Sequence, residues 1–288
     1  MQLTPPILAD GSVHTELRAL LSAACPHPVC CNEREPELVR RIHNEYARAG
    51  ARALRTNTRG ANRIEMGALG LAGRCEAFNN AGSALAFDVA GREGIRMGTI
   101  GAIGTDGTGA DARPDERDLA YGEQAIYLSD TGVTFFLLEH FDEVDEVLRL
   151  LRVVRRNSDA PVLAQLRFDA AGRTSDGLTA AQAAERLAGA GADALGVSCG
   201  PGFAHLPPIV DALLGAGLPV SLMPGLAQAP AEPPFPGAGA ATPEEFAAAM
   251  LPFIRQGVAI AGGCCGVSPA HIAALARAVA GTGAPPAS

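Results

Sequence analysis

Short apolar runs alternate with amphipathic stretches along most of the chain. Eight runs are typical of buried strands: residues 7–9, 53–56, 96–100, 135–138, 162–166, 194–197, 220–223 and 258–261. Between them, apolar residues recur with the period of an α-helix, as in residues 36–49, 142–156, 179–188, 243–256 and 269–279. This alternation predicts an α/β protein with a parallel sheet, and eight such units close most naturally into a (β/α)8 barrel. We therefore expect a single TIM barrel domain over residues 1–288.

Two segments interrupt the alternation. Residues 104–114 are rich in Gly, Thr and Asp, and residues 227–241 form a tract of Pro, Gly and Ala. Such compositions disfavour helices and strands, and long irregular loops in compact domains are commonly functional. We expect both segments to lie over the mouth of the barrel, the second as a movable lid.

Polar residues follow several of the predicted strands. Asp10 and Gly11 come after the first strand, Asn57 after the second, and Glu139 after the apolar run 135–138. The carboxyl ends of barrel strands carry the active site, and an unpaired buried charge is costly. We therefore expect Asp10 and Glu139 to bind a ligand or to act in acid–base chemistry. Asn57 fits a simple strand-end turn equally well.

Three cysteines point to a metal. Cys199 follows the sixth strand, and Cys264 and Cys265 follow the eighth within a Gly-Gly-Cys-Cys-Gly sequence. Three thiolates at one point would hold Zn²⁺ and leave its fourth position open. Adjacent cysteines can also be small core residues, but flanking glycines let the backbone approach a ligand closely. Because the seven cysteines are an odd number and no signal-peptide pattern is present, we expect reduced thiols and a cytoplasmic protein.

Composition narrows the function further. The net charge of -8 and the few aromatic residues argue against a nucleic-acid partner, which requires a basic surface. No apolar run reaches the ~18 residues of a membrane-spanning helix, so we expect no membrane partner. All 23 basic residues are arginine, which excludes the lysine Schiff-base chemistry of some aldolase barrels.

Several motifs together resemble the homocysteine S-methyltransferase family. This family of zinc-dependent barrels includes the homocysteine module of cobalamin-dependent methionine synthase and the betaine- and S-methylmethionine-dependent enzymes. The similar sequences extend over nearly the whole chain: Leu8-Ala9-Asp10-Gly11 with Thr15-Glu16-Leu17, Glu37-Leu38-Val39 to Ile42-His43 with Tyr46 and Ala49-Gly50-Ala51, Thr56-Asn57-Thr58 with Gly60-Ala61-Asn62-Arg63, Glu139, and Gly262 to Gly266 with Pro269 and His271-Ile272. The last motif is the most specific of the set.

The resemblance implies a mechanism and a set of site residues. The three cysteines would bind Zn²⁺, which lowers the pKa of the homocysteine thiol and so creates the attacking thiolate that becomes methionine. By family position, Glu139 would pair with the substrate ammonium group, and Asp10 with the backbone amides around Gly11 and Ser12 would help to place the amino acid end. Asn57 is a further candidate for substrate binding. Displacement at a methyl carbon needs alignment more than acid–base help, so we expect no catalytic side chain beyond the activated thiol.

The methyl donor is the least determined part of the resemblance. The run Thr56-Asn57-Thr58 with Gly60-Ala61-Asn62-Arg63 is more similar to modules that work with corrinoid or folate enzymes than to the S-methylmethionine type. We therefore expect a methylcorrinoid donor. Because the chain carries no cobalamin signature, this donor would arrive on a corrinoid protein or free in solution. An S-methylmethionine- or betaine-type donor, methylation of another small thiol, and a non-catalytic zinc-binding barrel stay open.

The chain departs from the family pattern at positions that affect the substrate pocket. These positions are His14 for a small residue, Arg59 for phenylalanine, His140 for threonine, Ser198 for asparagine, and Gly225 for asparagine. None of them removes a predicted zinc ligand. We expect His14 and His140 to be structural hydrogen-bonding groups, with substrate contact or proton donation as the open alternative.

A second group of thiols lies near the N-terminus. Cys25, Cys30 and Cys31 surround a Pro-His-Pro sequence, which invites interpretation as another metal site. Their spacing matches no established metal-binding pattern. We expect a proline-stiffened loop with incidental thiols.

Overall fold

The computed structural model describes residues 6–22, 25–105, 107–226 and 241–281. Its strands are β1 (Ile7–Leu8), β2 (Ala53–Arg55), β3 (Ile95–Gly101), β4 (Phe135–Phe141), β5 (Val162–Leu166), β6 (Ala194–Cys199), β7 (Val220–Pro224) and β8 (Ile260–Ala261). Each of the predicted runs forms a strand. Because β4 and β6 extend farther than predicted, Glu139, His140 and Cys199 belong to strand ends and not to the loops that follow.

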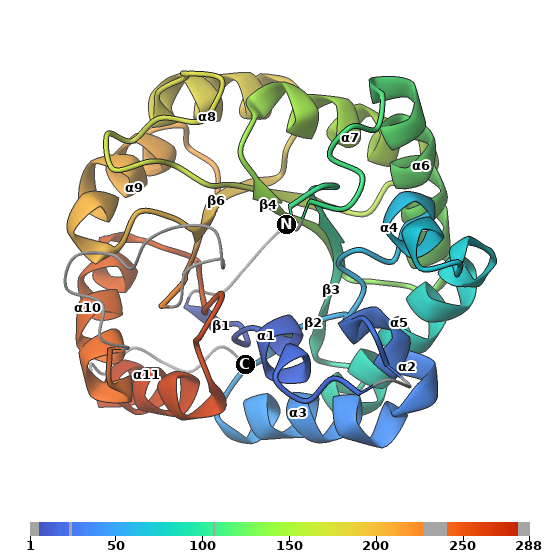
Figure 1. Ribbon diagram of the computed structural model, residues 1–288. Helices are drawn as coiled ribbons and strands as arrows, with labels where there is room; N and C mark the ends of the chain where they lie inside the picture. The colour runs from blue at the N-terminus through green and yellow to red at the C-terminus, as the bar shows by residue number, and fades with distance from the viewer. Residues whose placement is uncertain (1–5, 23–24, 106, 227–240, 282–288) are drawn as a thin grey trace.

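The strands form one parallel sheet in the order β1-β8-β7-β6-β5-β4-β3-β2. The two edge strands meet where Ala9 pairs with Ala53 in a parallel bridge and the Asp10 amide donates to the Ala53 carbonyl at 3.0 Å. Figure 1 shows the strands inside a ring of helices. The predicted (β/α)8 barrel is therefore confirmed.

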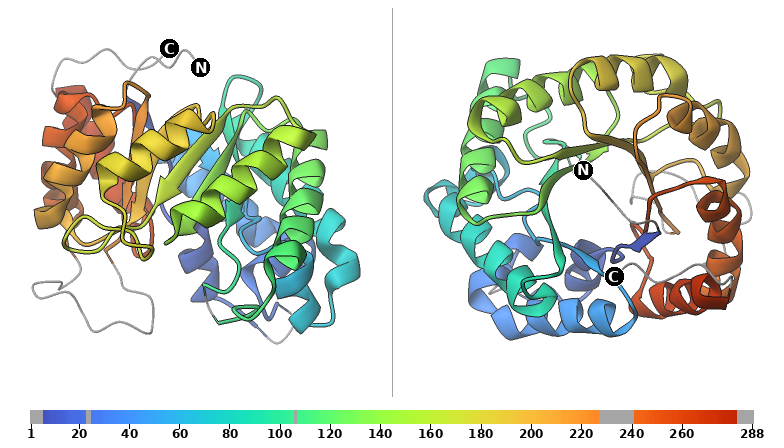
Figure 2. Two further views of the ribbon diagram at one scale, coloured as in Figure 1. Left: turned by 90° about the horizontal axis from the view of Figure 1, so that it is seen from above. Right: turned by 180° about the vertical axis from the view of Figure 1, so that it is seen from behind.

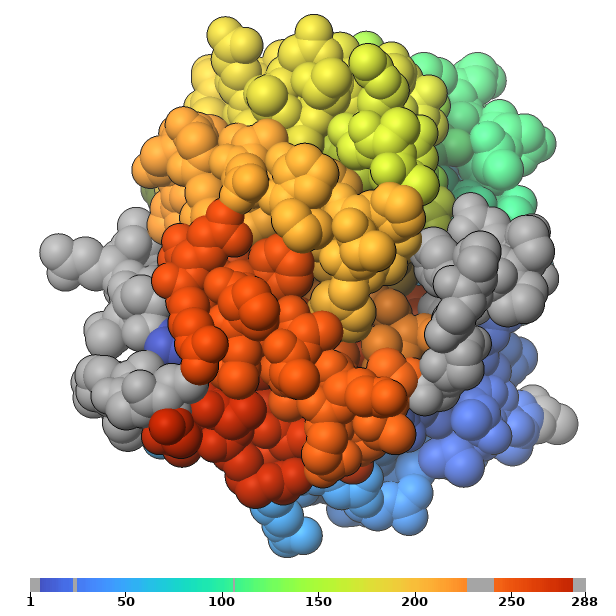
Figure 3. Space-filling view, turned by 90° about the vertical axis from the view of Figure 1, so that its left-hand side faces the viewer, coloured from blue at the N-terminus to red at the C-terminus, as the bar shows by residue number. Residues whose placement is uncertain are grey.

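The described helices are α1 (Val13–Arg18), α2 (Cys31–Arg34), α3 (Pro36–Arg48), α4 (Arg63–Ala68), α5 (Cys75–Ala90), α6 (Pro114–Asp130), α7 (Val144–Asn157), α8 (Ala180–Gly189), α9 (Leu206–Leu214), α10 (Pro243–Gln256) and α11 (Pro269–Gly281), with the 3-10 turns η1 (Pro28–Cys30), η2 (Ala72–Arg74) and η3 (Phe203–His205). Most of them cover the outside of the barrel (Figure 2), whereas α1 lies at the mouth and lines the cavity described below. The helices predicted from periodicity correspond to α3, α7, α8, α10 and α11. Figure 3 shows α10 and α11 side by side on one outer face.

Local sequence explains how these helices begin and which face they bury. α3 starts with Pro36, whose missing N–H is not needed in a first turn, and it buries Val39, Ile42 and Tyr46 at helical spacing. α10 starts with a capping box, in which the Thr242 hydroxyl accepts from the Glu245 amide and the Glu245 carboxylate accepts from the Thr242 amide.

The apolar core has two layers. Along β4, Phe135 and Leu137 belong to the cluster inside the barrel, whereas Phe136 and Leu138 belong to the cluster between strands and helices. This alternation follows the period of a strand, and burial on both faces explains why β4 begins as a continuous apolar run. The barrel interior is therefore filled with side chains, and the polar site lies at its end.

The two segments predicted as mouth loops differ in what the structure describes. The described residues of 104–113 form turns and irregular loop, as predicted for residues 104–114, except that Pro114 already begins α6. Thr105 and Gly107 from this segment line the cavity described below. The predicted lid over residues 227–241 lies, except for Ala241, outside the described residues and stays a prediction. No described helix is both long and apolar enough to cross a membrane.

Candidate metal centre

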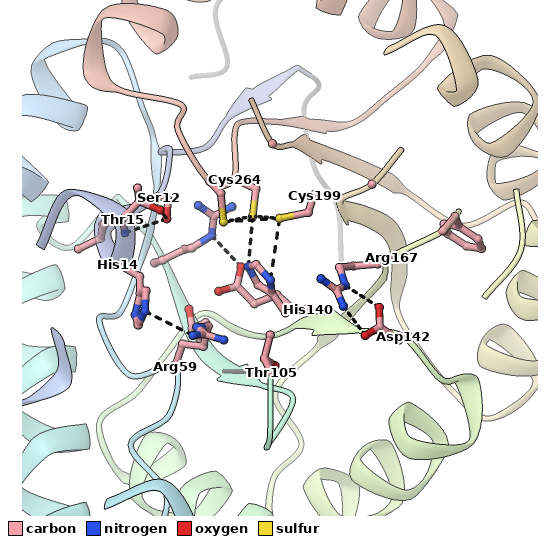
Figure 4. Close-up of a pocket in the computed structure, with 18 of the residues that line it drawn as sticks. Ser12, His14, Thr15, Arg59, Thr105, His140, Asp142, Arg167, Cys199 and Cys264 are labelled. Carbon is pink, nitrogen blue, oxygen red and sulfur yellow. Dashed lines mark hydrogen bonds and ion pairs between the residues drawn. The ribbon is translucent and has the colours of Figure 1, made fainter. Parts of the chain in front are cut away.

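Three cysteine sulfurs meet at the carboxyl end of the barrel (Figure 4). The Sγ atom of Cys199 lies 2.7 Å from that of Cys264 and 3.7 Å from that of Cys265. The Sγ atoms of Cys264 and Cys265 are 3.9 Å apart. Cys199 is the last residue of β6, while the other two follow β8, and all three are free thiols. The fold thus brings the three predicted ligands together.

His140 lies against the same sulfurs. Its Nε2 atom is 3.2 Å from the Sγ of Cys264, and its Nδ1 atom is 3.9 Å from the Sγ of Cys199. One ligand atom from each of His140 and the three cysteines falls within 4.8 Å of the others, the one such group in the described part of the chain. Burial lowers the pKa of His140, so the neutral ring keeps a lone pair that a metal could accept.

Local backbone geometry directs His140 and Cys199 to this point. They are the only non-glycine residues among those described with a left-handed backbone, at φ of 65° and 57°. Such conformations cost about 1–3 kcal/mol and gather at functional sites. The register between β4 and β5 shifts between Leu138 and Phe141, and the His140 amide donates to the Ser198 hydroxyl at 3.0 Å. Irregularities of this kind redirect a side chain.

The two glycines before the cysteine pair are required by close packing. A Cβ atom at Gly263 would lie 2.1 Å from a methyl carbon of Val267, and one at Gly262 would lie 2.8 Å from the Cβ of Ala9. Both neighbours are buried and packed, so neither has room to move aside. The glycines therefore let the chain turn tightly after β8 and present two sulfurs at the barrel end.

The donor set fits zinc. With Zn–S bonds of about 2.3 Å, neighbouring sulfurs of a tetrahedral site lie about 3.8 Å apart. Two of the three sulfur pairs have that spacing, and the pair of Cys199 and Cys264 would have to widen by about 1 Å. Hydrogen bonds from Cys199 and Cys264 lower the pKa of Cys265, so the cluster favours one thiolate even without a metal.

Arg55 was not predicted as a site residue, yet it lies between the two predicted carboxylates. Its Nη1 atom is 3.3 Å from Asp10 Oδ1, and its Nε atom is 3.3 Å from Glu139 Oε2. Its Nη2 atom donates to the Gly263 carbonyl at 2.9 Å. Burial alone would lower the pKa of Arg55, but Glu139 and Asp10 hold it above its ordinary value. The sequence did contain a signal for this role, because Arg55 is a charged residue within a predicted buried strand.

A cavity of about 850 Å³ opens beside the sulfur cluster. Its lining includes the three cysteines, Glu139 and Asn57. Asp10 and Gly11 are buried behind Arg55 and are not among the described lining residues. The Asp10 carboxylate accepts a hydrogen bond from the Arg55 backbone amide at 2.8 Å, and the Gly11 carbonyl accepts one from the Arg55 guanidinium. Burial raises the pKa of Asp10 to about 7, although the Arg55 charge opposes that rise.

Asn57 joins the cavity wall to the segment before α3. Its Nδ2 atom donates to the Pro28 carbonyl and to Asn32 Oδ1, both at 2.8 Å. The Asn32 amide in turn donates to the Asn57 carbonyl at 2.8 Å. Asn57 therefore has the structural function expected of a strand-end turn as well as a place beside the cavity.

Arg59 and His14, two departures from the family pattern, meet on the cavity wall. Their Nη2 and Nε2 atoms lie 3.4 Å apart (Figure 4), and the His14 ring contacts His27 edge-on with centroids 5.6 Å apart. Burial and the Arg59 charge lower the pKa of His14. Arg59 forms no ion pair with a carboxylate of the described residues, so its charge faces the cavity.

Cys25, Cys30 and Cys31 form no second metal cluster in the part of the chain that the structure describes. All three are buried in apolar clusters, as expected for incidental thiols. The segment itself differs from the predicted loop, because it folds into η1 and α2. Burial raises the pKa of Cys31 to about 12, so this thiol stays protonated.

Known proteins are similar in sequence to this chain over most of its length. The 31% identity to methionine synthase of Mycobacterium tuberculosis extends over 268 residues, 86% of this chain and 22% of that protein. The S-methylmethionine–homocysteine S-methyltransferase of Pongo abelii is 29% identical, over 95% of this chain and 78% of that protein. The chain therefore spans about a fifth of the length of the methionine synthases that it matches.

Solved structures are also similar to this chain. The metallated form of the homocysteine methyltransferase MmuM from Escherichia coli has a TM-score of 0.75 and 25% identity, over 94% of this chain and 96% of that one. The carboxyl transferase domain of Rhizobium etli pyruvate carboxylase, at 15% identity and a TM-score of 0.52, shares the fold alone. The family described as homocysteine S-methyltransferase matches residues 7–279. The chain thus belongs to the homocysteine S-methyltransferase family.

Proposed function

We propose that this protein transfers a methyl group to the thiol of homocysteine, giving methionine, with Zn²⁺ held by Cys199, Cys264 and Cys265. The observation that carries the proposal is the meeting of these three thiols at the edge of a large cavity. When bound, zinc would lower the pKa of the substrate thiol and so supply the nucleophile at neutral pH.

The residues beside the sulfurs fit the remainder of an amino acid thiol. Glu139 lines the cavity, and its Oε2 atom lies 3.3 Å from Arg55 Nε, so its carboxyl group is placed to accept from the substrate ammonium group. Asp10 and Gly11 act indirectly, because they hold the guanidinium that positions Glu139. Asn57 also lines the cavity, where it would contact the amino acid end of the substrate.

The charge of the cavity wall supports a methylcorrinoid as the donor. Five arginines, among them Arg18, Arg59 and Arg173, and three carboxylates belong to the described lining residues, so the wall carries an excess of positive charge. Arg59 lies near enough to Cys265 to affect its pKa. Betaine and S-methylmethionine carry the reactive methyl on a positive centre, which these arginines would repel. A methyl–cobalt group carries no such charge. The similarity to methionine synthase supports the same choice, while the similarity to the S-methylmethionine enzyme supports the alternative donor.

A donor panel tests the proposal. Zinc-loaded protein and homocysteine would be mixed with methylcobalamin, S-methylmethionine or betaine at equal concentrations, and methionine would be quantified by mass spectrometry. We expect the fastest methionine formation with methylcobalamin and none above background for Cys264→Ser. Faster turnover with either onium donor would overturn the corrinoid assignment. The same panel would be repeated with cysteine as the acceptor, and faster methylation of cysteine would overturn homocysteine as the substrate. Wild-type activity of Cys264→Ser would overturn the metal mechanism.

A further inference from the structure

We propose that the His140 imidazole is the fourth metal ligand of the resting protein and that it leaves this position when the substrate thiol binds. The inference rests on the proposed zinc site and deepens it. A site with three thiolates would leave its fourth position to water. With His140 beside the sulfurs, the chain itself supplies a complete set of four donors.

Distances within the cluster fit a tetrahedral site. With a Zn–N bond of about 2.0–2.1 Å and a Zn–S bond of about 2.3 Å, the nitrogen and a sulfur lie about 3.5 Å apart. The His140 Nε2 atom lies 3.2 Å from the Cys264 sulfur. The four donor atoms also fall within 4.8 Å of one another.

The backbone holds His140 in a conformation that a simple wall residue would not need. Its left-handed φ of 65° is unfavourable for a side chain with a Cβ, and strain of this kind marks functional positions. The hydroxyl that fixes the His140 amide belongs to Ser198, directly before the ligand Cys199, which is itself left-handed. His140 and Ser198 both depart from the family pattern, and here they bind each other. The hydrogen bond between His140 and Ser198 therefore positions the imidazole ring next to the cysteine sulfurs.

Exchange at this position leaves atoms and charges balanced. The metal–Nε2 bond breaks, a bond to the substrate sulfur forms, and the thiol proton leaves to solvent, with no change of oxidation state. The adjacent cavity gives room for both the released ring and the incoming thiol. Because the imidazole and the thiol compete for one position, His140 weakens thiol binding and covers the metal between turnovers.

X-ray absorption at the zinc edge tests the inference without relying on turnover. In the wild type we expect three sulfurs and one nitrogen, with the multiple scattering typical of imidazole. His140→Ala should keep three sulfurs, lose the imidazole scattering and bind zinc about tenfold or more weakly. Homocysteine should raise the count to four sulfurs in both proteins, and its Kd should be several-fold lower for His140→Ala because the competitor is gone. His14→Ala, which removes the neighbouring cavity histidine, should keep the wild-type spectrum.

The outcomes separate this inference from the proposed function. Imidazole scattering that is absent from the wild type, or that persists in His140→Ala, would overturn His140 as a ligand. Weaker homocysteine binding by a folded His140→Ala would overturn the competition between ring and thiol. Fewer than three sulfurs in the wild type, or no fourth sulfur with homocysteine in either protein, would instead contradict the proposed zinc site and its substrate.

Discussion

Arg55 determines how the buried carboxylates of the site behave. It contacts Asp10 and Glu139, and all three side chains are almost fully shielded from solvent. A buried ion pair adds little compared with an apolar core, but removing one partner leaves an uncompensated charge. We therefore predict that Arg55→Met lowers the free energy of unfolding by about 3–5 kcal/mol.

Urea denaturation of Arg55→Met and Arg63→Met measures this difference. Arg63 forms an ion pair with Glu123 at 2.8 Å, but its side chain is 46% exposed. Removing such a surface pair should cost about 1 kcal/mol or less. An equal loss in the two variants would show that Asp10 and Glu139 do not depend on Arg55.

Glu139 is predicted to recognise the ammonium group of the substrate. Glu139→Gln keeps the shape of the side chain but removes its charge, so the KM for homocysteine should rise about 10- to 100-fold, as expected for loss of one charged hydrogen bond. Zinc content should stay normal. The matched comparison is a thiol of similar length without the amino group, whose KM the substitution should leave unchanged. A KM for homocysteine equal to that of the wild type would remove Glu139 from this role.

The helix α3 contains a titratable group that affects stability. His43 is fully buried, and neither ring nitrogen has a hydrogen-bond partner among the described residues. Burial lowers its pKa to about 4. Below its unfolded pKa of about 6.5 only the unfolded chain binds the proton, so stability falls as pH falls from about 6.5 to 4, by roughly 3 kcal/mol in all.

Replacing His43 isolates this effect. His43→Leu should flatten the change in urea midpoint between pH 7 and pH 5, because leucine binds no proton. The exposed His205 gives a control, since His205→Leu should keep the wild-type pH dependence. The same pH dependence in the wild type and His43→Leu would exclude His43 as its source.

The sequence predicted the strands and the cysteine ligands, but it did not predict the contacts between residues that are distant in the chain. The run 135–138 identified β4 because a strand buried on both faces is apolar throughout. The rest of β4 could not be seen in this way, because the left-handed His140 depends on a hydroxyl 58 positions away in Ser198. Glycines next to Cys264 and Cys265 marked a close backbone approach, whereas nothing in the local pattern showed that Arg55 would pair with two distant carboxylates.

Across the whole molecule, metal binding would join the ends of β4, β6 and the turn after β8. A ligand that binds only the folded protein stabilises it by about 4 kcal/mol at a thousand times its Kd. Removing zinc should therefore lower the Tm. We expect a weak chelator to remove zinc from each of the ligand variants, Cys199→Ser, Cys264→Ser and Cys265→Ser. Adding zinc should then no longer raise their Tm, whereas it should still raise the Tm of Cys75→Ser, whose substitution lies in α5. Full zinc retention by all three ligand variants would contradict the assignment.

Proton release on binding of homocysteine tests the central claim, that the protein ionises a substrate thiol on a metal held by its cysteines. Calorimetry in buffers of different ionisation enthalpy counts the protons. A free thiol is mostly protonated at pH 7, so zinc-loaded protein should release about one proton per site. Cys199→Ser stripped of zinc should release none. Binding of homocysteine to the zinc-loaded wild type without proton release would contradict the account and identify the chain as a barrel that binds the metal without activating the thiol.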